Sequence, residues 1–184
     1  MKSLKETLVQ EGLIKRQAGM DMRAKIEAWL ASRGIRKYTI NDDLTIDIKG
    51  DVYLNHYKEK QLPDYIQIRK VTGYFDINNS SNLETLKGCP QEVGGSFDCS
   101  ECPKLESLEY APQKVGRSFD CCECPIKSLE GAPQEVWGSF YCYRCKELES
   151  LKGAPQKVGR HFHCDECPKL ESLEGAPQYV YGDF

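Results

Sequence analysis

The chain has 184 residues, of which 40% are hydrophobic and 29% charged, and its formal net charge is −3. No apolar run approaches the roughly 18 residues that a membrane span needs, so we expect a soluble protein. Residues 1–40 hold nine Lys/Arg against four Asp/Glu (+5), whereas residues 41–184 hold sixteen against twenty-four (−8). This acidic second part argues against a surface that wraps a phosphate backbone.

The start of the chain does not resemble an export signal. Glu6 and Glu11 interrupt the stretch where a signal peptide needs a continuous apolar core. We therefore expect a cytoplasmic protein, whose ten cysteines are free thiols or metal ligands and not disulfides.

Residues 1–40 are predicted to be a helical N-terminal region that caps the rest of the chain. The pattern predicts a helix over 21–33, with Asp21 as its N-cap and Gly34 as its C-cap. Its apolar face would hold Met22, Ile26, Trp29 and Leu30. A separate earlier helix over 4–17 is weakened by Gly12.

The segment TINDDLTIDI, which follows, predicts a β-hairpin that turns at residues 41–43. Such a hairpin could cover the first edge of a sheet.

A repeat of 21–22 residues governs the rest of the chain. Pro-Gln recurs at Pro90, Pro112, Pro133, Pro155 and Pro177, and this period lies in the leucine-rich-repeat range. Regular units fill 87–184, and divergent units fill 41–86, so residues 41–184 form one repeat domain.

One unit, APQKVGRSFDCCECPIKSLEG, predicts a single coil with a short strand of roughly three to five residues. Alternation turns Phe119 and Cys121 inward and Ser118, Asp120 and Cys122 outward. Leucines such as Leu105 and Leu108 form a second wall.

One coil cannot bury its apolar face alone, so the coils must stack and align their strands into a parallel sheet. Equivalent phenylalanines should then form a ladder: Phe97, Phe119, Phe140 and Phe162. The predicted fold class is an α+β repeat, a leucine-rich-repeat-like solenoid preceded by a helical cap.

The repeated residues FDCSECPKLESLEYAPQKVG resemble the leucine-rich-repeat-like proteins of tailed bacteriophages and bacteria, whose units run approximately F-x-C-S-x-N-x-L-x-S-L-E-G-A-P. The resemblance covers roughly 44–184 and, more distantly, extends to repeats of certain bacterial surface proteins. It implies a curved, non-catalytic scaffold whose open sheet face contacts other proteins. A phage-encoded inhibitor or modulator of a host protein, such as an anti-defence or anti-CRISPR factor, is the function it suggests.

The cysteines depart from that resemblance, because a second cysteine stands where many family members have asparagine. Their C-x-x-C spacing suits zinc, yet every pair falls at one phase of the repeat, which favours a buried structural ladder. A zinc site bridging coils stays open as the alternative, and its ligands would be Cys99, Cys102, Cys121, Cys124, Cys142, Cys145, Cys164 and Cys167.

Four further cysteine and histidine positions bear on this choice. His161 and His163 could join Cys164 and Cys167 in a mixed site, but alternation sends the histidines to the opposite face. Cys89 fills a position that later units give to Ala, and we expect it in the core. Cys122 is the thiol expected to be exposed and most reactive.

No catalytic motif, cofactor motif or phosphate loop is present, so we expect no enzymatic activity and no cofactor. A protein-binding role would fall on residues that vary between coils on the exposed strand face, among which Tyr, Trp and Arg are favoured at interfaces. The candidates are Tyr74, Asp76, Arg117, Asp120, Trp137, Tyr141, Tyr143, Arg144, Arg160, His161 and His163, with Tyr53 and Asp98 on the same face. The competing interpretation is that these aromatics only cover the sheet.

Two other function classes remain open. A zinc-stabilised nucleic-acid-binding protein would use the basic N-terminal residues Lys15, Arg16, Arg23, Lys25, Arg33, Arg36 and Lys37. A virion structural component is the other.

The last unit ends at Phe184, within the strand that every earlier unit completes. We expect Val180 and Phe184 to be half exposed, and this edge to pair with a second copy, forming a homodimer, or with a target.

Overall fold

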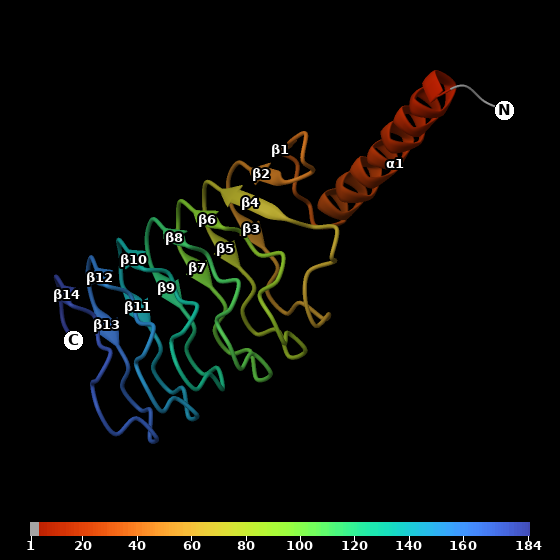
Figure 1. The fold of residues 1–184 in the computed structure, drawn as a ribbon. Helices are drawn as coiled ribbons and strands as arrows, with labels where there is room; N and C mark the ends of the chain where they lie inside the picture. Colours follow the sequence, from red (N-terminus) through yellow and green to blue (C-terminus); the bar gives the residue numbers. More distant parts are fainter. Residues whose placement is uncertain (1–3) are drawn as a thin grey trace. The chain divides into compact units, whose positions relative to one another are not determined.

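The computed structural model describes residues 4–184 and divides the chain into two compact units (Figure 1). The first unit ends at Arg36 and is helical, and the second, Lys37–Phe184, contains every strand. No helix in the described part of the chain is both long enough and apolar enough to cross a membrane.

The first unit contains one continuous helix, α1 (Leu4–Ser32), where the sequence predicted two. The prediction of Asp21 as an N-cap is wrong, because Asp21 lies inside this helix. Its carboxylate accepts a hydrogen bond from the Gln17 side chain (3.0 Å) one helical turn earlier. Glycine costs a helix about 1 kcal/mol relative to alanine, and without a proline that cost does not break it at Gly12 or Gly19.

The end of α1 is as predicted. Gly34 lies at φ +71°, its N–H donates to the carbonyl of Ala31 (3.0 Å), and the Ile35 N–H donates to the carbonyl of Leu30 (2.9 Å). This pair of bonds is the Schellman motif, which glycine favours because it has no Cβ. Of the predicted apolar face, Ile26, Trp29 and Leu30 are buried.

The second unit is a parallel β-solenoid with two sheets, which we name sheet A and sheet B (Figure 1). In the described residues, sheet A has eight strands: β1 (Tyr38–Ile40), β2 (Ile46–Ile48), β4 (Ile68–Val71), β6 (Glu92–Val93), β8 (Lys114–Val115), β10 (Glu135–Val136), β12 (Lys157–Val158) and β14 (Tyr179–Val180). Sheet B has six: β3 (Val52–Tyr53), β5 (Phe75–Asp76), β7 (Phe97–Asp98), β9 (Phe119–Asp120), β11 (Phe140–Tyr141) and β13 (Phe162–His163).

The predicted fold class is confirmed, but the sequence foresaw only sheet B. Each coil also contributes a strand to sheet A, and this strand ends in the valine of P-Q-x-V. Val93 pairs with Val115, and Val136 pairs with Val158. The regular strands are two residues long, shorter than predicted, because the chain turns a corner soon after each one. In sheet A only the valine of each such strand is buried, whereas a buried cysteine such as Cys121 follows the sheet B strand, so only sheet B shows alternation in the sequence.

The predicted hairpin is present and becomes the first edge of sheet A. Strand β1 pairs antiparallel with β2, and β2 pairs in parallel with β4. The turn extends beyond the predicted residues, since the Asn41 N–H donates to the carbonyl of Thr45 (2.8 Å) and Leu44 adopts φ +66°. The hairpin thus ends the parallel sheet with an antiparallel strand.

A ladder of stacked phenylalanines runs through the core, as predicted. Ring centroids of Phe97, Phe119, Phe140 and Phe162 lie 5.4, 5.1 and 5.4 Å apart, with interplanar angles of 9–15°. Phe75 extends the stack at one end, with its ring centroid 5.5 Å from that of Phe97. The half-exposed Phe184 extends it at the other end, 5.3 Å from Phe162. Offset aromatic pairs add about 0.5–1.5 kcal/mol each beyond burial of their area. The predicted second wall is also present, since Leu105 and Leu108 are buried.

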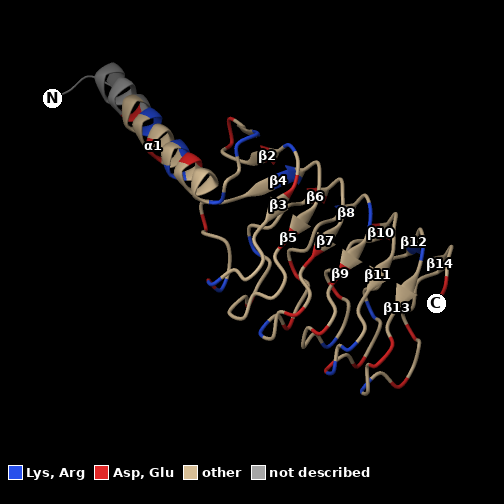
Figure 2. Ribbon diagram, turned by 180° about the vertical axis from the view of Figure 1, so that it is seen from behind, with Lys and Arg blue, Asp and Glu red and all other residues tan. Residues whose placement is uncertain are grey.

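Charged side chains pair from one coil to the next along the outside of the solenoid. Figure 2 shows residues of both signs side by side on the coil loops, and ion pairs such as Lys114–Glu92 (3.3 Å), Lys157–Glu135 (3.3 Å) and Lys152–Glu130 (2.8 Å) join residues 22 positions apart. Exposed pairs of this kind each contribute little to stability.

Each regular coil ends at a left-handed backbone position. Gly88, Gly131, Gly153 and Gly175 occupy it at φ +86° to +92°, and Tyr110 occupies the same position at φ +69°. A non-glycine residue in this conformation costs roughly 1–2 kcal/mol. Tyr110 is 53% exposed, so little burial of its side chain offsets that strain.

We expect Tyr110→Gly to raise the free energy of unfolding by about 0.5–1 kcal/mol, since relief of the strain exceeds the entropy that glycine adds to the unfolded chain. Urea denaturation followed by circular dichroism measures the change. The matched substitution Gly131→Ala should destabilise, because a Cβ there would lie 2.6 Å from the Leu108 carbonyl. A loss of stability in Tyr110→Gly would show that the tyrosine makes contacts worth more than the strain.

Candidate protein-binding surface

The cysteines form two ladders whose thiols bond to the backbone of adjacent coils. In the first ladder, Cys99, Cys121 and Cys142 donate to carbonyls of the following coil, those of Asp120, Tyr141 and His163, at 3.3–3.4 Å. All three are fully buried, and burial raises their thiol pKa well above the usual value. They remain protonated and act as weak hydrogen-bond donors.

The second ladder bonds in the opposite direction along the solenoid. Cys124, Cys145 and Cys167 donate to the carbonyls of Cys99, Cys121 and Cys142 in the preceding coil, at 3.2–3.3 Å. Cys102 lies near the Ile77 carbonyl in the same way (3.6 Å). In the divergent coil before it, Ser80 occupies this place, donating to the Ile77 carbonyl (2.7 Å) and accepting from the Tyr57 N–H (2.9 Å).

The prediction that Cys122 points outward is wrong. The Cys122 side chain is 2% exposed, and burial is the largest cause of its raised pKa. Strand alternation fails here because Asp120 accepts a hydrogen bond from the Cys122 N–H (3.0 Å) and turns the chain. The less buried thiols are Cys164 and Cys167, in the last complete coil, and Cys89 lies in the core as expected.

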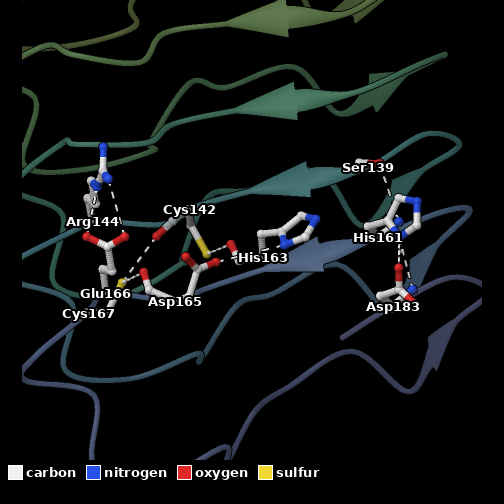
Figure 3. A network of polar contacts seen from close by, with 9 residues as sticks. All are labelled: Ser139, Cys142, Arg144, His161, His163, Asp165, Glu166, Cys167 and Asp183. Carbon is white, nitrogen blue, oxygen red and sulfur yellow. Dashed lines mark hydrogen bonds and ion pairs between the residues drawn. The ribbon is translucent and has the colours of Figure 1, made fainter.

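Among the side chains that the structure describes, those of residues 11 and 13–184, no three His, Cys, Asp or Glu are grouped closely enough to hold a metal ion. His161 and His163 lie near each other, with ring centroids 5.8 Å apart, and each faces an aspartate, Asp183 or Asp165 (Figure 3). The structural ladder therefore accounts for the thiols better than zinc ligation does.

We expect a chelator to leave the thermal midpoint unchanged, because thiols that donate to carbonyls need no metal. Differential scanning calorimetry with and without EDTA tests this, alongside metal analysis of the purified chain. About one zinc per chain, together with unfolding by the chelator, would contradict the ladder and favour the zinc-site alternative.

The outer face of sheet B carries the candidates Asp76, Asp120, Tyr141 and His163 in one column, with Asp98 between the first two. The aspartates have a structural task, because Asp76, Asp98 and Asp120 each accept a hydrogen bond from the N–H two residues later, at 3.0 Å. This turn explains why three successive coils of the column carry aspartate. Burial raises the pKa of Asp76 and Asp120, and the neighbouring Asp98 raises it further.

Tyr74 belongs to the same part of the face and is also engaged. Its hydroxyl donates to Asp98 (3.2 Å), and its ring lies 6.1 Å from that of Tyr53. Its pKa is raised by burial and then by the Asp98 carboxylate. Tyr74, Asp76 and Asp120 therefore stabilise coil turns and are weaker binding candidates than the sequence suggested.

The C-terminal half of the column differs, because Tyr141 and His163 replace the aspartates. Their rings stack at 5.4 Å with an interplanar angle of 5°. Together with Tyr143, Arg144, Asp165 and Glu166 they line an open groove of about 370 Å³. The structure thus brings four of the candidates, Tyr141, Tyr143, Arg144 and His163, to one place.

Arg144 in that groove is already paired on both sides. Its guanidinium donates to Glu166 of the following coil through two nitrogens, at 2.9 and 3.3 Å (Figure 3). It also donates to Glu123 of the preceding coil (3.5 Å). It also lies 5.8 Å from the Tyr143 ring. It is an organising residue of the groove and not a free cation.

His161 belongs to a row of equivalent positions at which the side chain accepts a hydrogen bond from a backbone N–H of the next coil. Ser96, Ser118 and Ser139 accept from the same position one coil on, at 3.1–3.3 Å, and the His161 Nδ1 accepts from the Asp183 N–H (3.0 Å). His161 therefore helps to attach the last residues of the chain. There the Phe162 N–H also donates to the Asp183 carbonyl (2.9 Å), and the edge of β14 beyond stays open. Self-association through this edge stays a prediction.

The remaining candidates, Arg117, Trp137 and Arg160, lie at the corner between sheets A and B. We use "corner" for the first two residues after each regular sheet A strand, such as Gly116 and Arg117 after β8. The first corner position is glycine in three coils, as Gly94, Gly116 and Gly159, where a Cβ would lie 2.1–2.4 Å from a carbonyl oxygen of the preceding coil.

Trp137 occupies this glycine position and disturbs the backbone there. The N–H of each of the three glycines donates across the coils at 2.8 Å, whereas the Trp137 N–H lies 3.4 Å from the Val115 carbonyl. At the same position in other coils, the Thr72 N–H lies 3.0 Å from the Ile48 carbonyl and the Tyr181 N–H lies 3.1 Å from the Val158 carbonyl. The Trp137 side chain is 74% exposed, so the solenoid gains little burial in return. The sequence held this signal, since the residue after the repeated valine is glycine in three units, including the two on either side of Trp137.

The fold and surface define a class, a parallel β-solenoid whose corner and sheet face carry exposed aromatics. Comparisons with protein-family models, with curated protein sequences and with solved structures found no significant match.

Proposed function

We propose that the solenoid is a non-enzymatic protein-binding module that recognises its partner through the corner at Trp137 and the groove beside Tyr141. The observation that carries this proposal is Trp137, an exposed tryptophan at a position that both adjacent coils fill with glycine, as Gly116 and Gly159. A residue that weakens a coil-to-coil hydrogen bond and buries little of itself has no structural benefit. Tryptophan is also among the residues most enriched in interface hot spots.

The groove supports the same conclusion. Tyr141 and His163 replace the aspartates that terminate strands in the preceding coils, so the turn loses a side-chain hydrogen bond while the face gains two stacked rings. Rigid aromatic side chains provide contact area at little entropic cost.

Nucleic-acid binding by a zinc-stabilised fold has less support. The thiols donate to carbonyls, and the residues from 41 onward carry eight more acids than bases. The role of a phage-encoded inhibitor of a host protein and that of a virion component both stay predictions, the first resting on the resemblance of the repeats.

We expect Trp137→Gly to stay within about 1 kcal/mol of the unsubstituted protein in stability, because a shorter hydrogen bond and a more flexible unfolded chain act in opposite directions. Combined with Tyr141→Ala, it should abolish capture of a partner from a bacterial lysate. Affinity capture followed by mass spectrometry measures the loss, and urea denaturation verifies the fold.

Tyr110→Gly is the matched control, since it also removes an exposed aromatic ring and places glycine where the repeat has it. A partner captured equally by the unsubstituted chain and the Trp137→Gly/Tyr141→Ala variant would show that the surface is wrong. A chain that captures no protein would remove support for the binding function itself.

A further inference from the structure

The corner carries four large side chains, one per coil, that alternate between arginine and an aromatic ring: Arg117, Trp137, Arg160 and Tyr181. All four are exposed, Trp137 by 74% and Tyr181 by 77%. We call them the corner row. Tyr181 was not among the candidates that the sequence indicated.

Glycines separate the members of the corner row. The two corner positions are Gly-Arg in the coils of Arg117 and Arg160, and Trp-Gly or Tyr-Gly in the coils of Trp137 and Tyr181. A Cβ at Gly116 would lie 2.3 Å from the Gly94 oxygen, and one at Gly138 would lie 2.7 Å from the Arg117 carbonyl carbon. Close backbone approach thus keeps the positions between the large side chains bare.

The two arginines of the row have no partner in the described residues. Ion pairs between coils engage Lys114, Lys157 and Arg144, but neither Arg117 nor Arg160 makes an ion pair or a side-chain hydrogen bond. Arginine presents five donors in a planar fork suited to carboxylates. Two unpaired guanidinium groups in one row therefore favour a ligand with repeated negative charge.

The spacing of the row favours one ligand conformation. Strands stack about 4.8 Å apart, so the two rings are about 9.6 Å apart along the solenoid, as are the two arginines. A polyproline II helix repeats every three residues, about 9.3 Å. An extended strand repeats one face about every 6.6 Å and an α-helix turns every 5.4 Å, so neither matches the row.

We propose that the corner row binds an acidic polyproline II segment of a partner protein. Prolines at every third residue pack against Trp137 and Tyr181. Carboxylates that recur with the same period pair with Arg160, between the two rings, and with Arg117, one coil before Trp137. Polyproline II ligands are preformed and lose little entropy on binding to aromatic surfaces. This inference rests on the proposed function and names the partner chemistry at the Trp137 end of that surface.

The corner leaves room for such a segment to continue past Arg117. An open groove of about 480 Å³ follows in the preceding coils, and Gly73, Gly94, Gly95, Tyr53, Tyr74 and Asp51 are among the residues that line it. Asp51 favours an uncharged part of the segment at that end. Single-stranded nucleic acid also combines negative charge with stacking, so it is the competing ligand that the test has to separate from an acidic peptide.

Fluorescence anisotropy with labelled synthetic peptides tests the inference on the full chain. The probes are two acidic peptides of about four repeats, Pro-Glu-Ala and Pro-Ala-Glu, which place the carboxylate at either intervening position. Their controls replace Glu with Lys, or Pro with Gly, and an oligothymidine of similar length represents nucleic acid. The protein variants are Trp137→Gly and Arg160→Gly, each of which installs the residue that neighbouring coils already use, with Tyr110→Gly as the matched control.

We expect at least one acidic proline peptide to bind at least tenfold more tightly than its lysine and glycine controls. Trp137→Gly and Arg160→Gly should each weaken that binding at least tenfold, and Tyr110→Gly should leave it unchanged. Equal binding of acidic and basic peptides, tighter binding of oligothymidine, or binding that survives both variants would overturn the inference. If neither acidic peptide binds while lysate capture still depends on Trp137, the inference fails and the proposed function stands. If neither acidic peptide binds and lysate capture does not depend on Trp137, both the inference and the proposed function fail.

Discussion

Parallel stacking of coils on a repeat of about 22 residues is the constraint on which the rest of this structure depends. Each strand is too short to hold a sheet by itself, so every coil depends on the hydrogen bonds and side chains of the coils beside it. Stacking places equivalent residues in columns. A residue that suits one coil, such as Phe119, then gains a partner ring on each side.

The columns explain why the chain uses thiols and glycines so regularly. A buried cysteine is small enough to fill the turn and still donates to a carbonyl of the adjacent coil, in one direction from Cys121 and in the other from Cys145. Glycine at the corner lets backbones approach closely, as at Gly116. Because these columns have structural reasons, a residue that departs from its column without a structural benefit indicates selection for something else.

Much of this organisation could be predicted from the sequence, because periodicity reports columns directly. The phenylalanine ladder, the buried leucines and the position of Cys89 follow from the repeat alone. Sheet A could not be predicted, since each of its regular strands buries only the valine, whereas the sheet B strand starts an alternation of buried residues such as Phe119 and Cys121. Cys122 was misplaced because alternation assumes a continuing strand, whereas Asp120 turns the chain. The site was only partly foreseen: variability identified Trp137 and Tyr141 but also Asp76, Asp120 and Arg144, whose hydrogen bonds and ion pairs only a structure reveals.

The central claim is that stability passes from coil to coil through the stacked columns. Hydrogen–deuterium exchange on a Phe119→Leu variant tests it most directly, because that change interrupts the ring stack at one coil and leaves a leucine to fill the core. We expect exchange to accelerate most in β9, then in β7 and β11 on either side, less in β5 and β13, and least in β3, as nearest-neighbour coupling requires. Acceleration by the same factor in every strand, or in β9 alone, would contradict the account.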